Sequence, residues 1–112
     1  MLNKKLLVLT SSLLCVFLLG EANAQSSKNI EFSRNVGMTL ELKQRCEGKA
    51  VPKSITQRLG VKFFAMGITP EEFGAGANQG AAIVARAHPG NKRPSAKMCR
   101  DAQEMFEMLM MI

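Results

Sequence analysis

Several residue types that mark catalytic sites or small β domains are missing from this chain or rare in it. Tryptophan and tyrosine are absent, and histidine occurs only once among the 112 residues. The apolar content comes from Ala, Leu, Ile, Val, Met and Phe, so the aromatic and β-branched enrichment of small β domains is missing. This composition favours helices.

The scarcity of reactive side chains argues against an enzyme. His88 precedes a proline in a predicted turn, where we expect a loop residue rather than a general base. No serine lies in a nucleophile-elbow pattern and no Cys-x-x-Cys pair is present. The glycine-rich stretch 74–80 lacks the lysine and threonine of a phosphate-binding loop. We therefore predict a non-enzymatic protein without a cofactor or a catalytic metal.

Residues 1–24 are typical of a secretory signal peptide. Lys4 and Lys5 precede an apolar run over 6–19, and Ala22 and Ala24 place small residues where a signal peptidase requires them. The run of about 14 residues is shorter than the roughly 20 that a membrane-spanning helix needs. We predict cleavage after Ala24, no stable membrane span, and a periplasmic or secreted protein.

The predicted mature chain, residues 25–112, has the length of one small domain. Such a domain buries only about 60–65% of its unfolded surface, so its stability is marginal without a covalent link. Cleavage would remove Cys15 and leave Cys46 and Cys99. In an oxidising compartment these two most simply form one disulfide, worth about 4 kcal/mol in the chain-entropy model. Separate thiols, or pairing between two chains, are the alternatives.

Apolar periodicity predicts four helices joined by short turns. The polar residues 25–29 are expected to fray ahead of a first helix over 30–46. Ser54 is expected to cap the second helix and Ser95 the fourth, which runs to the C-terminus. The third helix begins at Thr69-Pro70-Glu71-Glu72, which has the pattern of a capping box, and extends to about Ala87.

Helices joined by short turns usually pack antiparallel, so we predict an all-α fold, a small antiparallel bundle of about four helices. In an up-down-up-down order the first helix ends where the fourth begins. Cys46 and Cys99 lie at these two positions, so the predicted disulfide agrees with the predicted topology. The glycines of the third helix either allow a neighbouring helix to approach closely or break the helix near Gly76.

Basic residues flank both cysteines, and the mature chain keeps an excess of about five positive charges. The disulfide would gather eight of them at one end of the bundle, which we call the basic pole. A surface of one sign attracts anionic partners, here an acidic protein or an anionic envelope component; a merely solubilising surface is the alternative. Nucleic acid is not expected for an exported chain without an aromatic stacking platform. The basic pole comprises Lys43, Arg45, Lys49, Lys53, Lys92, Arg93, Lys97 and Arg100.

Methionine is concentrated in the last predicted helix, where Met105, Met108 and Met111 recur every three residues. Methionine packs irregular cores and adaptable binding grooves, so core packing and partner contact are both open. Thioethers also select copper(I), which makes a copper-binding protein a further, less favoured possibility.

The favoured prediction is an exported binding or accessory protein that engages another envelope component. The chain is also similar, in broad outline, to the acid-stress chaperones of the HdeA/HdeB type, which are short, exported and helical and carry one disulfide. That similarity implies a periplasmic stress chaperone as the alternative. It extends to no individual motif, so it transfers no site residue to this chain.

Overall fold

The computed structural model describes the backbone of residues 2–90 and 92–112 and the side chains of residues 24–90 and 92–112. Its helices are α1 (Leu2–Glu47), α2 (Lys53–Ala65), α3 (Pro70–Ala87) and α4 (Ala96–Met110), and the described backbone contains no strand. The all-α prediction is confirmed. Within the described part of the chain, no helix is both long and apolar enough to cross a membrane. Nearly all side chains of the predicted signal peptide lie outside the described residues, and its cleavage stays a prediction.

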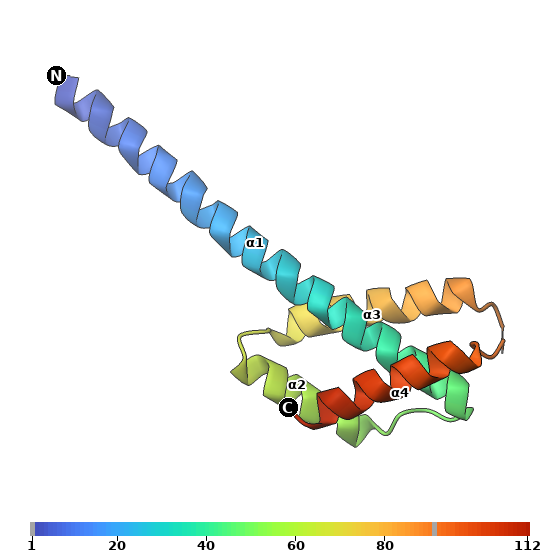
Figure 1. Cartoon of the computed structure of the whole chain (residues 1–112). Helices are drawn as coiled ribbons and strands as arrows, with labels where there is room; N and C mark the ends of the chain where they lie inside the picture. The colour runs from blue at the N-terminus through green and yellow to red at the C-terminus, as the bar shows by residue number, and fades with distance from the viewer. Residues whose placement is uncertain (1, 91) are drawn as a thin grey trace.

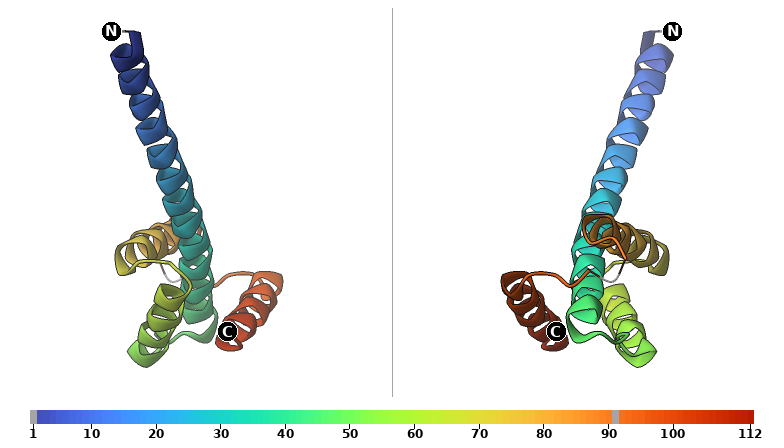
Figure 2. Two further views of the ribbon diagram at one scale, coloured as in Figure 1. Left: turned by 90° about the vertical axis from the view of Figure 1, so that its left-hand side faces the viewer. Right: turned by 90° about the vertical axis from the view of Figure 1, so that its right-hand side faces the viewer.

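Helix α1 is the central element of the bundle. Its C-terminal half lies between α4 on one side and α2 and α3 on the other, and its N-terminal half extends beyond them (Figures 1 and 2). Asn29 of α1 donates a hydrogen bond to Glu72 of α3, and further along both helices Arg34 donates to Gln79. Because the residue numbers increase in both helices from one contact to the next, α1 and α3 run in the same direction. Helix α4 starts where α1 ends and runs back along it.

Glycine permits the direct contact between α1 and α3. A Cβ atom on Gly80 would collide with the backbone of α1 at Arg34 and Met38. A Cβ on Gly76 would collide with Ser33 and the backbone beside it, and Gly37 of α1 meets the backbone of α3 at Ala77 in the same way. Helix α3 continues through Gly76 without a break, so close helix approach, one of the two predicted roles of these glycines, is confirmed.

The hydrophobic core lies where α1, α2, α3 and α4 meet. Phe63 is fully buried, and its ring contacts Phe32 edge-on at 5.3 Å between centroids and Phe73 at the same distance in a tilted arrangement. Helix α2 is therefore held mainly by Leu59 and Phe63, its two buried residues. The core cluster consists of Val36, Leu40, Leu59, Phe63, Ile68, Phe73, Phe106 and Leu109.

Two of the three predicted N-terminal helix caps are confirmed and one is wrong. The Thr69 hydroxyl accepts from the Glu72 amide, and the Glu72 carboxylate accepts from the Thr69 amide, which completes the capping box. Ser95 accepts from the Met98 amide as predicted. Ser54 is not the cap of α2: the extended residue before the helix is Pro52, and no side chain caps it. Ser54 already lies inside the first turn, so its hydroxyl is out of position.

Residues 25–29, predicted to fray, instead continue α1. Asn29 is buried, and its amide donates to the Gly67 carbonyl at 3.1 Å and to the Glu72 carboxylate at 3.0 Å. Gln25, which lies one turn before Asn29 in α1, donates to the Asn29 side-chain oxygen. The prediction of fraying failed because it rested on polarity alone. Asn29 has hydrogen-bond partners in the α2–α3 turn, at Gly67, and in the first turn of α3, at Glu72.

Candidate functional site

The disulfide between Cys46 and Cys99 builds the candidate site. The bond is formed, with Cα atoms 5.8 Å apart, and it joins the last turn of α1 to the first turn of α4. It spans 53 residues of sequence, so it brings together two basic segments that are distant in the chain. The predicted basic pole is therefore assembled from segments that the structure holds next to each other.

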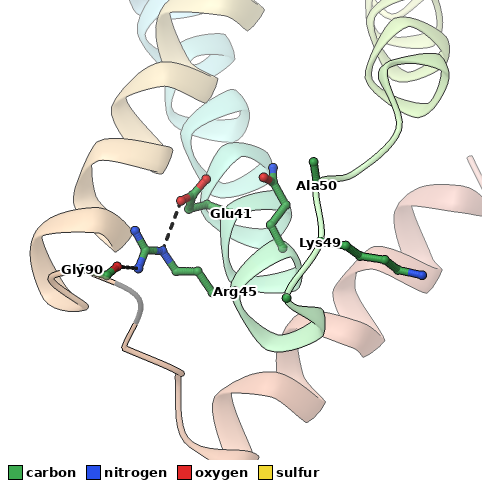
Figure 3. A pocket seen from close by; sticks show the side chains of 7 residues that line it. Glu41, Arg45, Lys49, Ala50 and Gly90 are labelled. Carbon is green, nitrogen blue, oxygen red and sulfur yellow. Dashed lines mark hydrogen bonds and ion pairs between the residues drawn. The ribbon is translucent and has the colours of Figure 1, made fainter.

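Arg45 is the internal tie of the basic pole. Its Nη1 donates to the carbonyl oxygens of His88 at 2.7 Å and Gly90 at 2.9 Å, and its Nε donates to Glu41 at 3.1 Å. These bonds fix the α3–α4 connection against the end of α1 (Figure 3). Because both Nε and Nη1 of its guanidinium donate to groups within the fold, Arg45 positions the site rather than presenting its charge outward.

Lys43 is the second member of the pole whose charge is used inside the fold. Its Nζ donates to Gln103 at 2.8 Å, pairs with Glu47, and lies 4.3 Å from the centroid of the Phe106 ring. The hydrogen bond and charge of Lys43 lower the pKa of Glu47. Lys43 therefore joins α1 to α4, one turn away from the disulfide.

The six other members of the pole are exposed side chains. Within the described structure, Lys43 and Arg45 are the only members of the basic pole that form an ion pair. In Figure 3 the Lys49 side chain extends away from Arg45. The exposed members are Lys49, Lys53, Lys92, Arg93, Lys97 and Arg100.

A shallow groove of about 540 Å³ lies beside this surface. Its walls come from the last turns of α1, from the α1–α2 connection and from Gly90 (Figure 3). Gly48 and Gly90 both adopt positive φ, +70° and +67°, which lets the two connections turn sharply at the same end. The groove is lined by Glu41, Gln44, Arg45, Gly48, Lys49, Ala50 and Gly90.

His88 lies at this end of the bundle as expected from its position in the sequence, but it is not an exposed loop residue. It follows the last residue of α3, its amide donates to the Val84 carbonyl, and its side chain is buried. Its Nδ1 has no hydrogen-bond partner among the described residues. The predicted loop position is correct, because His88 lies just beyond the end of α3, and the structure adds that its side chain is buried.

The methionines predicted as a partner contact are exposed, so core packing does not explain them. Met105 is 45% exposed, Met108 57% and Met111 80%. The three do not share one environment: Met105 lines a groove between α1 and α4, whereas Met108 and Met111 do not line that groove.

A second exposed apolar surface lies on α2, and it was not predicted from the sequence. Phe64 is 63% exposed, and Val61 and Met66 are exposed beside it. A groove of about 500 Å³ runs from Val61 and Phe64 to Pro70 and Phe73 of α3. The signal was present in the sequence, since Phe64 and Val61 lie off the stripe formed by Leu59 and Phe63.

The comparisons with known proteins give no guide to this arrangement. The chain matches no family model, no curated protein and no solved structure.

Proposed function

We propose that this chain is an exported, non-enzymatic binding protein that engages an anionic envelope component through the basic pole. The observation that carries the proposal is the Cys46–Cys99 bond, which joins two segments bearing six exposed cations. Residues that are merely solubilising need no such fixed arrangement. A fixed cluster of one sign raises the local potential and attracts anions from solution.

The internal tie of the pole supports the same proposal. Arg45 donates two hydrogen bonds to backbone carbonyls of the α3–α4 connection, which holds that connection beside α1 before any partner arrives. A preorganised surface loses less conformational entropy when it binds. Lys92 and Arg93 follow this tied segment directly, so the tie limits where their charges lie.

The partner is expected to be anionic and extended over several charges, such as an acidic protein surface or an anionic envelope polymer. Exposed ion pairs are individually weak, about 0–1 kcal/mol each, so measurable affinity needs several cations acting together. Such binding weakens as salt screens the charges, with a Debye length of about 10 Å at 0.1 M. Salt dependence is therefore the first property to measure.

The test is retention of envelope components on the immobilised, oxidised protein at low and at moderate salt. Lys92→Gln with Lys97→Gln removes two charges from the pole. The matched control is Lys28→Gln with Arg58→Gln, which removes the same net charge from exposed positions elsewhere on α1 and α2. We expect one retained component, lost with the first variant and kept with the second.

Equal loss in both variants would mean that only net charge matters, and it would overturn the proposed site. A different result would favour the chaperone alternative: no specific partner at neutral pH, but broad retention of unrelated proteins after a pulse of acid. Export itself is tested by sequencing the N-terminus of the protein recovered outside the cytoplasm. We expect it to begin at Gln25.

A further inference from the structure

The groove between α1 and α4 differs chemically from the rest of the surface. Its volume is about 330 Å³, and its walls carry three of the chain's methionines. One of them, Met38, comes from α1, and the other two, Met98 and Met105, come from α4. The groove is lined by Asn35, Met38, Thr39, Leu42, Met98, Asp101, Ala102 and Met105.

The α4 wall of the groove presents its donors at helical spacing. Met98, Asp101 and Met105 follow at i, i+3 and i+7, so they lie on one face of the helix. Their Cα atoms span about 10 Å at 1.5 Å per residue, with the carboxylate between the two thioethers. Methionine is unbranched and has three rotatable bonds, so the thioethers at the two ends of that span can turn toward one ion between them. Met38 faces them from the other helix.

The methionines of the groove are not packing a core. Met98 is 37% exposed and Met105 is 45% exposed, and Met38 is half-buried. The buried residues of α4 are instead Ala102, Phe106 and Leu109. The three methionines therefore line a space that a ligand can enter.

The charge of the groove is opposite to that of the protein. The chain carries a formal net charge of +6, yet no lysine or arginine lines this groove. Its single ionisable lining residue is Asp101, a carboxylate. A groove of this charge favours a cation, whereas the basic pole favours anions.

We propose that this groove is a site for a soft monovalent metal ion, copper(I) or its analogue silver(I). Thioethers of Met38, Met98 and Met105 would supply the donors, and the Asp101 carboxylate would compensate the charge. Thioether sulfur is a soft ligand that selects copper(I), whereas magnesium and calcium require several oxygen ligands and one carboxylate does not provide them. The proposal is independent of the basic pole and of the partner proposed for it.

The structure changes which methionines are assigned to the metal. The sequence spacing singled out Met105, Met108 and Met111, but Met108 and Met111 do not line the groove. Met38 is 60 residues or more from the others in sequence, so spacing gave no sign of it. The disulfide keeps Cys46 and Cys99 out of competition, because thiolates bind these ions more strongly than thioethers.

The probe is silver(I), because the reductants that maintain copper(I) would also attack the disulfide. The protein is used in the form recovered from the producing cell with its disulfide intact, and any other thiol is blocked by alkylation. Silver(I) nitrate is added in chloride-free buffer. Native mass spectrometry gives the stoichiometry, and NMR of the methionine ε-methyl groups shows which thioethers respond.

We expect one bound silver ion and shifts of the Met38, Met98 and Met105 methyl resonances. Met98→Leu with Met105→Leu should weaken binding by more than about tenfold, since even indirect changes around a metal commonly cost 10–100-fold. The matched control is Met108→Leu with Met111→Leu, which removes two thioethers from the same helix and should leave the affinity within about twofold. Asp101→Asn should weaken binding less than the groove pair.

Three results would overturn the proposal. They are the absence of silver binding by the wild-type protein, equal weakening in the two methionine pairs, and shifts confined to Met108 and Met111. The wild-type NMR result stands by itself, so it decides the question even where the groove variant does not fold.

Discussion

The contact between α1 and α3 makes the sharpest prediction about stability, since alanine at two glycines of one helix should act in opposite directions. Gly80→Ala would place a methyl group against the α1 backbone at Arg34 and Met38, which no change of side-chain rotamer can relieve. Overpacking of this kind typically costs about 1–3 kcal/mol. Gly74→Ala, in the same helix, meets nothing within 4 Å.

Helix propensity works in favour of alanine at both positions, by up to about 1 kcal/mol. We therefore expect Gly74→Ala to raise the free energy of unfolding by about 0.5–1 kcal/mol. We expect Gly80→Ala to lower it by up to about 2.5 kcal/mol, the overpacking cost less the propensity gain. The measurement is urea unfolding of the oxidised protein, followed by far-ultraviolet circular dichroism. Both variants should keep the wild-type m-value if only the folded state is affected.

Two outcomes would refute this reasoning. If both variants were stabilised, α1 and α3 would not be in direct backbone contact, and the parallel pairing of the two helices would be wrong. If both variants were destabilised equally, the loss of stability would come from alanine in α3 in general rather than from the collision at Gly80. A drop of more than about 3 kcal/mol would instead indicate that the helix pair cannot separate enough to relax.

Three further predictions concern the disulfide, the pH response and a cap. Cys46→Ser with Cys99→Ser should cost about 4 kcal/mol in urea unfolding, by the chain-entropy estimate, and a loss below about 1 kcal/mol would mean that the reduced chain already holds these segments together. The pKa of Glu72 is lowered from 4.5 to about 2, mainly by the hydrogen bond from the Thr69 amide and then by that from Asn29. Its ionised form therefore stabilises the fold fully above pH 4.5, and this contribution is lost as the pH falls toward 2. The gap in urea midpoint between wild type and Glu72→Gln should shrink over that range, and a constant gap would contradict the assignment. Ser95→Ala should lower the unfolding free energy by about 1 kcal/mol while Ser54→Ala stays within about 0.5 kcal/mol, and equal effects would contradict the cap assignment.

The acid response of Glu72 also bears on the chaperone alternative. Because its pKa is lowered to about 2, this carboxylate holds the α1 and α2–α3 contacts together in mild acid. A chaperone released by mild acid would need a different trigger. Near-ultraviolet spectra are weak without tryptophan and tyrosine, so exposure of apolar surface is better followed with a hydrophobic dye between pH 7 and 2.

Local signals in the sequence predicted local structure well. The capping box at Thr69 and Glu72 needs only residues within one turn, so the pattern identified the start of α3 correctly. The Ser54 cap prediction failed because Pro52 already holds an extended backbone before α2, and α2 begins two residues too early for Ser54 to be its N-cap. The polar stretch 25–29 failed because its hydrogen-bond partner, Glu72, lies 43 residues away from Asn29.

The candidate sites divide in the same way. The basic pole was predictable because its residues flank the two cysteines directly, and a single bond between Cys46 and Cys99 joins the two groups. The inward use of Lys43 and Arg45 was not predictable, because their partners, Gln103 and the carbonyls of His88 and Gly90, lie far along the chain. Spacing within one helix likewise grouped Met105 with Met108 and Met111, and left Met38 out.

The sequence by itself determined the helical class and the order of the charges along the chain, and it favoured the Cys46–Cys99 pairing, because these follow from composition, short-range periodicity and neighbours along the chain. Tertiary structure alone decided that α1 and α3 pack directly and in parallel, that Arg45 ties the basic pole together, and that Met38 meets the methionines of α4. The physical reason is that each of these depends on which surfaces come into contact. Backbone approach at Gly37, Gly76 and Gly80 sets that contact for α1 and α3. No periodicity within one helix specifies which partner a glycine face will meet.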